Sequence, residues 1–354
     1  MKHNKIIGIG AAACMLVLIL DSRTALSGAV SGVELCIKTL IPSLFPFFVL
    51  SILLTNALAG QTISILKPIA SVCKMPTGTE SILAIGFLGG YPVGAQSVSG
   101  LYRKGHLTQS QAMRMLVFCN NAGPAFIFGF LSSFFTKSGN CWYLWLIQIV
   151  SALFVGFLLP VDSIGKNRIL PVQKVSVTDV FAQSIKAIAL VCGWVVFSRM
   201  ILEFAHKWIW NNFPPFIQTV LCGICELSNG CIKLKEIQNE GLRFITASSL
   251  LSLGGICVML QTSALSDGVS MNLYFPGKLL QCCISLLLSY ILQMILPFTS
   301  QITSFPLVIT TGLIAIIIGS YLRHPKITVA FRELLLYNRS SNMKEVSSCC
   351  FAKK

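Results

Sequence analysis

The residues of this 354-residue chain whose chemistry stands out are polar groups inside apolar runs. Asn120 and Asn121 are adjacent carboxamides directly before Gly123-Pro124, and Glu226 is a carboxylate inside the run 216–232. Buried carboxamides are costly unless hydrogen-bonded, and an acid at membrane depth marks a functional site by default. We therefore expect the carboxamides to bind either a ligand or the backbone groups that lose their helical partners at Gly123-Pro124. For Glu226 we expect proton carriage, cation binding or a salt bridge.

A glycine-rich run, Gly86-Phe-Leu-Gly-Gly-Tyr-Pro-Val-Gly94, precedes these carboxamides. Its glycines, four apart, would allow close helix packing, whereas Pro92 prevents a continuous helix and frees backbone groups to face a ligand. At membrane depth such breaks are tolerated where they line a cavity, as in transporters. Because basic residues flank the run on both sides, we expect a re-entrant hairpin over 81–100, turning near Tyr91-Pro92.

The elements that position these polar groups are membrane helices, as the composition of the chain indicates. Hydrophobic residues make up 54% of the chain and charged residues 11%, with a mean hydropathy of +0.76. Soluble domains carry about 25% charged residues. The net charge of +15 is scattered over loops and tails, which favours a topology signal over nucleic-acid binding.

The chain contains neither a G-x-x-x-x-G-K-[ST] loop nor an H-E-x-x-H or G-x-S-x-G pattern, so we expect no enzyme, cofactor or metal.

The fold class predicted from the apolar runs is an all-α polytopic membrane protein, with about eight transmembrane helices and two re-entrant hairpins. The second hairpin is expected over the run that holds Glu226. The segment 24–38 is too polar to predict a span, and the first helix is expected to remain uncleaved. The expected spans are 6–20, 40–59, 112–134, 142–160, 183–204, 244–265, 277–297 and 303–322.

The two halves of the chain match in order, which predicts inverted repeats with both termini in the cytoplasm. Gly86…Gly94 corresponds to Gly223…Gly230, and Asn120–Gly123 corresponds to Ser252–Gly255. The expected organisation is an N-terminal helix and amphipathic connector (1–38), a first repeat (39–160), a cytoplasmic loop (161–182), a second inverted repeat (183–300), and a last helix with a basic cytoplasmic tail (301–354).

Three motifs in this order resemble the YlbJ-type sporulation integral membrane proteins, a group placed with the nucleoside-recognition, or Gate, domain proteins. They are Leu40-Ile-Pro-Ser-Leu-Phe-Pro-Phe-Phe48, Gly89-Gly-Tyr-Pro-Val-Gly-Ala95 and Phe118-Cys-Asn-Asn-Ala-Gly-Pro124, and the resemblance covers roughly residues 30–325. It implies a fold related to concentrative nucleoside transporters. It also implies a role in endospore formation and movement of dipicolinic acid towards the spore core.

The resemblance implies that the first hairpin and the helix break after it form part of a substrate site. It also implies that Glu226 is the acid of the second hairpin. A small aromatic dicarboxylate suits such a site, because amides at the starts of half-helices favour anions, and carboxamides can donate to carboxylates. The predicted substrate-binding residues are Gly90, Tyr91, Pro92, Gly94, Asn120, Asn121, Gly123, Glu226, Ser228 and Asn229.

The function expected from these observations is transport of a small polar or anionic metabolite, with dipicolinic acid first, across the bacterial cell membrane or the outer forespore membrane. Its partners would be the substrate, the lipid bilayer and a coupling proton or cation. One alternative is a non-transporting membrane scaffold for spore formation, and another is a Gate-type transporter of a nucleoside-like solute. The tail cysteines Cys349 and Cys350 fit lipidation or ordinary thiols.

Overall fold

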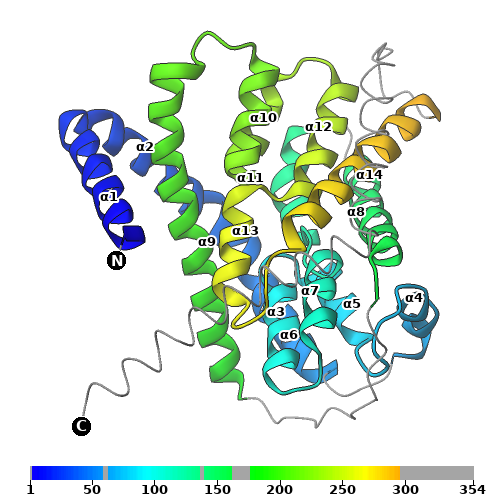
Figure 1. Cartoon of the computed structure of the whole chain (residues 1–354). Helices are drawn as coiled ribbons and strands as arrows, with labels where there is room; N and C mark the ends of the chain where they lie inside the picture. The colour runs from blue at the N-terminus through cyan, green and yellow to red at the C-terminus, as the bar shows by residue number, and fades with distance from the viewer. Residues whose placement is uncertain (1, 59–62, 136–138, 162–175, 296–354) are drawn as a thin grey trace, which may run out of the picture.

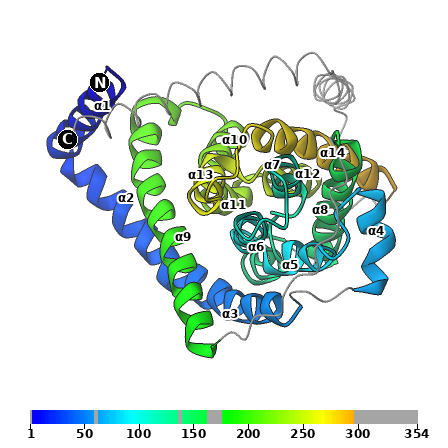
Figure 2. The same ribbon diagram turned by 60° about the horizontal axis from the view of Figure 1, so that its bottom comes forward.

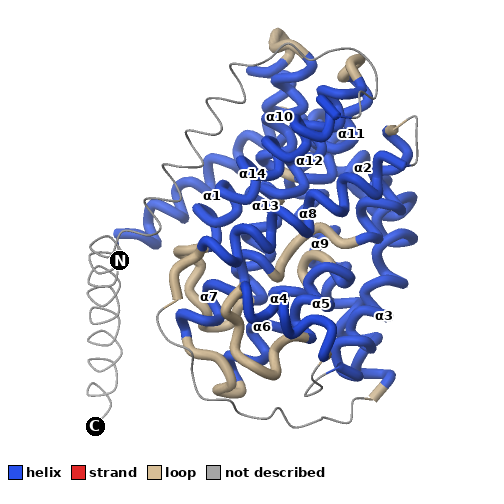
Figure 3. Tube along the Cα trace, turned by 90° about the vertical axis from the view of Figure 1, so that its right-hand side faces the viewer, coloured by secondary structure: helices blue, strands red, loops and turns tan. Residues whose placement is uncertain are grey.

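The computed structural model describes residues 2–58, 63–135, 139–161 and 176–295, and within these ranges the fold is built of helices without strands (Figures 1 and 3). The α-helices of the first half are α1 (Lys2–Leu20), α2 (Ser22–Leu35), α3 (Ile41–Leu58), α4 (Lys67–Val72), α5 (Ser81–Gly89), α6 (Val93–Arg103), α7 (Gln109–Phe118) and α8 (Gly139–Leu158). Those of the second half are α9 (Val177–Ala205), α10 (Pro215–Cys225), α11 (Leu227–Lys233), α12 (Glu240–Leu253), α13 (Gly255–Leu265) and α14 (Tyr274–Ile295).

Shorter helical turns of 3₁₀ or π type join or extend several of these helices. They are η1 (Cys36–Leu40), η2 (Ser64–Leu66), η3 (Ala125–Phe130), η4 (Leu131–Phe134), η5 (His206–Trp210) and η6 (Leu234–Glu236). The turn η1 connects α2 to α3 without a loop, so that one long helical rod runs along α9.

The segment 24–38 departs from its expectation, because it is helical and belongs to a candidate span of 33 residues, Ser22–Leu54. Its small residues explain the difference. Gly28 and Gly32 face α9, where a Cβ on Gly28 would lie 2.7 Å from the Cα of Met200. The polar side chains Glu34 and Lys38 pair with each other at 3.3 Å on the exposed side. Packing against α9 therefore compensates for the low hydrophobicity of this segment.

Five helical segments of the described chain are long and apolar enough to cross a membrane, fewer than the eight spans expected. They are Ser22–Leu54, Asn140–Leu158, Val177–Trp210, Glu240–Leu265 and Tyr274–Ile295, and shorter apolar helices cover Gly8–Leu20, Ala125–Phe134 and Pro215–Cys225. The long helix α9 begins six residues before the expected start of its span. The span expected at 303–322 and the basic tail lie outside the described residues.

Each half of the described fold contains a helical hairpin followed by an interrupted helix. In the first half, α5 and α6 form a hairpin that turns at residues 90–92, and α7 then stops at Phe118 before η3 begins. In the second half, α10 and α11 form a hairpin around Glu226, and α12 and α13 are separated at Gly254. The helices expected over 112–134 and 244–265 are thus each interrupted, the first at the break expected at Asn120–Gly123.

The interruption in the second half has a backbone cause. Gly254 and Gly255 adopt φ angles of +77° and +78°, which favour glycine and end α12 in a left-handed turn. We call residues 119–124 the first break and residues 254–255 the second break. The first hairpin lies in the lower part of Figure 1 and the second in the upper part. Helix α12 packs against the second hairpin, and α14 and α8 pack against α12 and α7. Figure 2 shows α2, α3 and α9 along one side of this group.

Large apolar side chains cover much of the outer surface of these helices. Leu146 and Phe154 on α8, and Phe181 and Ile201 on α9, are each about half exposed. In a water-soluble protein, exposed apolar patches of such extent mark an interaction surface. On helices of spanning length, they are the side chains that face lipid.

Candidate functional site

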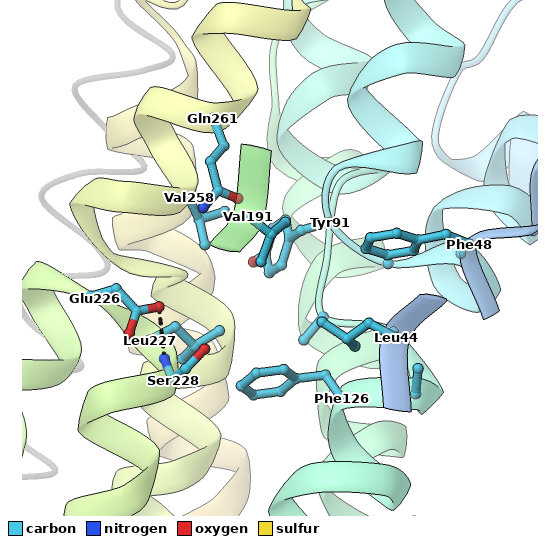
Figure 4. Close-up of a pocket in the computed structure, with 15 residues that line it drawn as sticks. Leu44, Phe48, Tyr91, Phe126, Val191, Glu226, Leu227, Ser228, Val258 and Gln261 are labelled. Atoms are coloured by element: carbon cyan, nitrogen blue, oxygen red, sulfur yellow. Dashed lines mark hydrogen bonds between the residues drawn. The ribbon is translucent and has the colours of Figure 1, made fainter. Parts of the chain in front are cut away.

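A small cavity lies between the tips of the two hairpins (Figure 4). Its volume is about 40 Å³, which is room for about three water molecules. The first hairpin contributes Gly90 and Tyr91, and the second contributes Glu226, Leu227 and Ser228. The other lining residues come from α3, α5, the first break, η3, α9 and α13: Leu44, Phe48, Gly89, Ala122, Gly123, Ala125, Phe126, Val191, Val258 and Gln261. The cavity is thus shared between both halves of the chain.

The walls of the cavity are mostly apolar, and one polar side chain in them has no hydrogen bond within the described part of the chain. Gln261 is 3% exposed, and its carboxamide makes no hydrogen bond to any described residue. In Figure 4 its polar end points towards Tyr91 and Val258. A buried amide without a hydrogen bond is costly, so this side chain is set to bind water or a ligand in the cavity. The rings of Phe48, Tyr91 and Phe126 offer apolar faces around it.

The first hairpin reaches the cavity because its tip contacts the first break directly. Gly90 has a φ of +74°, and a Cβ at this position would lie 2.7 Å from the amide nitrogen of Gly123. The next residue, Tyr91, joins Pro92 through a cis peptide bond. Its hydroxyl donates to the carbonyl oxygen of Leu251 at 3.2 Å. Leu251 lies in the last turn of α12, whose carbonyls lose their helical partners at the second break, so Tyr91 satisfies one of them.

The second hairpin reaches the cavity through Glu226, which is 2% exposed and caps α11. One carboxylate oxygen accepts from the amide of Ser228 at 2.9 Å. The other oxygen accepts from the amide and the side chain of Asn229 at 2.7 and 2.8 Å. Arg199 then donates to the Asn229 side-chain oxygen at 3.4 Å. The salt bridge considered from the sequence is therefore replaced by a helix cap, and the carboxylate charge is spread over three N–H groups.

Asn121 lies at the centre of a buried polar network behind the cavity. Its side-chain oxygen accepts from Lys278 Nζ at 3.0 Å, from Gln281 at 3.0 Å and from Gln148 at 3.4 Å. Its amide nitrogen donates to the carbonyl oxygen of Phe118 at 2.7 Å, at the open end of α7. Asn121 thus both satisfies the freed backbone and connects three helices.

Asn120 faces a different set of partners on the opposite side of the first break. Its amide nitrogen donates to the hydroxyls of Thr262 and Tyr274 at 2.9 and 3.0 Å. Its main-chain carbonyl accepts from Lys278 Nζ at 2.6 Å. Its side-chain oxygen is buried without a hydrogen bond among the described residues. The two carboxamides therefore join the first break to α13 and α14.

Five of the ten predicted site residues line the cavity: Gly90, Tyr91, Gly123, Glu226 and Ser228. The other five lie behind it: Pro92, Gly94, Asn120, Asn121 and Asn229. Gly94 packs against the carbonyl of Cys119, so its smallness serves the contact between hairpin and break.

Three polar residues of the site were missed from the sequence. Lys278 stands at the start of an apolar helix, where a lysine reads as a membrane-edge charge, yet it is 1% exposed. Gln148 and Gln281 sit singly in apolar helices and are buried as well. The signal that could have identified these residues is a single polar residue within a segment long enough to span the membrane.

Comparison with known proteins gave one relative, and neither a family model nor a solved structure matched. The relative is a Bacillus subtilis protein named "Sporulation integral membrane protein YlbJ", which is 28% identical over 143 residues. The matched part covers 39% of this chain and 34% of the relative, so the chain spans about a third of the length of that protein. This similarity bears out the resemblance to YlbJ-type proteins, and together with the apolar helices it identifies the chain as an integral membrane protein.

Proposed function

We propose that this protein is a sporulation membrane transporter that moves a small polar or anionic metabolite, with dipicolinic acid as the first candidate. The observation that carries the proposal is the cavity between the two hairpin tips, which is faced by the amide of Gln261, a group without a hydrogen bond to the described residues. Transporters with discontinuous helices bind substrate at such a place, where irregular backbone from two repeats meets. The sporulation role follows the name of the similar Bacillus protein.

The order of elements supports an inverted-repeat architecture. A long helix, a hairpin, an interrupted helix and a further helix occur in this order in both halves. The first hairpin lies in the lower part of Figure 1 and the second in the upper part, and residues of both tips line the cavity. Under this proposal both hairpins are re-entrant, and both termini are cytoplasmic.

The charges around the cavity support a polar or anionic solute. Three N–H groups already bind the Glu226 carboxylate, which lowers the repulsion it exerts on an anion. On the other side, Lys278 Nζ lies 5.5 Å from the ring centroid of Tyr91, which itself lines the cavity. The aromatic walls suit a planar ring. At about 40 Å³ the cavity is too small for a dipicolinate-sized molecule, so under this proposal the hairpins must move apart before a substrate binds.

The test measures dipicolinate in spores and mother cells of the source bacterium after deletion of the gene. We expect the deletion to leave dipicolinate in the mother cell and little in the spores, with rescue by wild type. A Gln261→Leu variant keeps the volume but removes the amide that faces the cavity, and we expect it to restore dipicolinate poorly. Normal spore dipicolinate in the deletion strain would remove this substrate.

A matched control is Gln183→Leu, the same substitution on an exposed position of α9. It should rescue as well as wild type, with equal amounts of both variants in the membrane fraction. Equal rescue by both variants would favour the scaffold alternative, in which the cavity has no role. Purified protein in liposomes provides the direct measurement, since a scaffold shows no solute flux and a nucleoside transporter shows flux of nucleosides instead of dipicolinate.

A further inference from the structure

Lys278 is the fifth residue of α14 and is buried at 1% exposure between α14, α7 and the first break. Its position depends on Gly277, because a Cβ there would overlap the side chain of Val117 on α7. The two helices consequently approach closely enough for the lysine to reach the break. Its Nζ donates to three oxygens: the main-chain carbonyl of Asn120 at 2.6 Å, Asn121 Oδ1 at 3.0 Å and Gln281 Oε1 at 2.9 Å.

This lysine has no acidic partner among the described residues. The four ion pairs of that part of the chain involve other lysines and arginines, and all four are at least partly exposed. Two aromatic rings lie near this group, with the centroids of Tyr91 and Tyr274 at 5.5 and 5.7 Å from Nζ. A buried charge without a counterion is costly, so its retention at membrane depth indicates a role for the charge itself.

The hydrogen-bond geometry around Nζ fits the charged form of the amine. An ammonium group has three N–H donors and no acceptor, and it meets three acceptors here. A neutral amine has only two N–H donors, and its lone pair would face a carbonyl oxygen. The faces of the two tyrosine rings also attract a cation and not a neutral amine.

The three oxygens are those that a bound monovalent cation would use. All belong to neutral carbonyl or carboxamide groups, and one is a main-chain carbonyl freed where α7 is interrupted. Unwound carbonyls of broken membrane helices coordinate Na⁺ or H⁺ in secondary transporters, and rings of carbonyls replace the water shell of K⁺ in channels. At this break, the ammonium group takes the central position.

We infer that Lys278 is a built-in cation, which holds the first break against α14 and fills the place where a free alkali cation would otherwise bind. The native protein then needs no Na⁺ or K⁺ at this break. Removing the amine while keeping the side-chain length should leave three oxygens around a vacant, cation-sized position. The inference is independent of the proposed transport function, because its test measures stability and ion binding in the absence of any solute.

The test compares the full-length wild-type protein with Lys278→Met in detergent, in KCl, NaCl and choline chloride at equal ionic strength. Wild type should show the same Tm in all three salts. In choline chloride the variant should lose about 5 °C or more, because three buried oxygens each lose the N–H donor that Lys278 supplies, although Asn121 Oδ1 keeps its bonds from Gln281 and Gln148. KCl or NaCl should raise its Tm in a saturable manner, as expected of a ligand that binds the native state. A control, Lys38→Met, removes a lysine whose side chain is 70% exposed and should give no salt-specific change.

Two results would overturn the inference. The first is a folded Lys278→Met protein with no difference between choline and alkali salts, which would reduce the lysine to a packing role. The second is a wild-type Tm that rises in KCl or NaCl relative to choline at this ionic strength. If the variant fails to fold in every salt, the binding of radioactive Rb⁺ and Na⁺ to the wild-type protein tests the inference instead. Binding that Asn121→Leu suppresses would place a free cation at the first break and refute the proposal. Absence of such binding supports it.

Discussion

Replacing Arg114 with methionine should destabilise the protein more strongly than any other single arginine replacement in its described part. The guanidinium of Arg114 is buried on α7, and it donates to main-chain carbonyls instead of acids. These carbonyls belong to Cys73 and Lys74 at the end of α4 and to Gly156 and Leu159 at the end of α8. Arg114 therefore caps two helices and fixes the helix that leads into the first break.

The size of the effect follows from these bonds. The bonds to Cys73, at 2.5 Å, and to Gly156 are short and buried, whereas those to Lys74 and Leu159 are 3.3 and 3.4 Å long. A hydrogen bond to a charged group contributes about 1.5–3 kcal/mol. Counting only the two short bonds, Arg114→Met should lower the free energy of unfolding by about 3–6 kcal/mol. Arg114→Lys should recover only part of this, because an ammonium group cannot span carbonyls on two helices.

The assay is reversible unfolding by SDS of the purified protein in mixed micelles, followed by circular dichroism. The matched control is Arg103→Met, which removes an exposed ion pair with Asp267 of 2.8 Å and should cost less than about 1 kcal/mol. A loss below about 1 kcal/mol for Arg114→Met would refute the reasoning, because two buried carbonyls would then have been left unpaired without the expected penalty.

Three further substitutions test the contacts around the cavity by the same unfolding assay. Gly90→Ala should cost at least about 1–3 kcal/mol, because its φ is positive and its new Cβ would press on Gly123. Tyr91→Phe should cost only about 1 kcal/mol, because Gln148 still donates to the carbonyl it abandons, at 3.3 Å. Glu226→Gln should cost about 1–3 kcal/mol, because the amide nitrogen that replaces one oxygen would face N–H donors.

Each of these variants has a control or a contradicting result. Gly100→Ala meets no atom within 4 Å and should be neutral or slightly stabilising, in contrast to Gly90→Ala. For Tyr91, a loss above about 3 kcal/mol would mean that Gln148 does not support the same carbonyl. Glu34→Gln removes an exposed carboxylate and should change stability by less than about 0.5 kcal/mol. A Glu226→Gln protein as stable as that control would argue against the capping role.

The positions of both hairpin tips could be predicted from the sequence because the signals for them are local. Pro92 cannot continue a helix, and the observed turn separates α5 from α6 at that point. Glu226 interrupts an apolar run, and the second hairpin turns there because the carboxylate caps α11. That these hairpins enter and leave a membrane on one side stays a prediction.

The polar network behind the cavity could not be predicted, because its partners are far apart in the chain. Lys278 and Asn121 are 157 positions apart, and Gln281 and Asn121 are 160 apart. No periodicity within one segment relates such residues. The candidate span that includes 24–38 was not predicted for a similar reason, since Gly28 is weakly hydrophobic and its contact with α9 joins distant parts of the chain. Tertiary contacts here override local propensity.

The bond between Tyr91 and the carbonyl of Leu251 fastens the tip of one half of the chain to the end of a helix in the other half, 160 residues away. Any rigid rotation that parts the halves must break this bond and disrupt the contacts of Asn121 with α14. The arrangement of the two halves described here is therefore held by polar contacts between them in addition to apolar packing. Weakening these polar contacts would change how often the two halves separate before it changed which molecules fit between the halves.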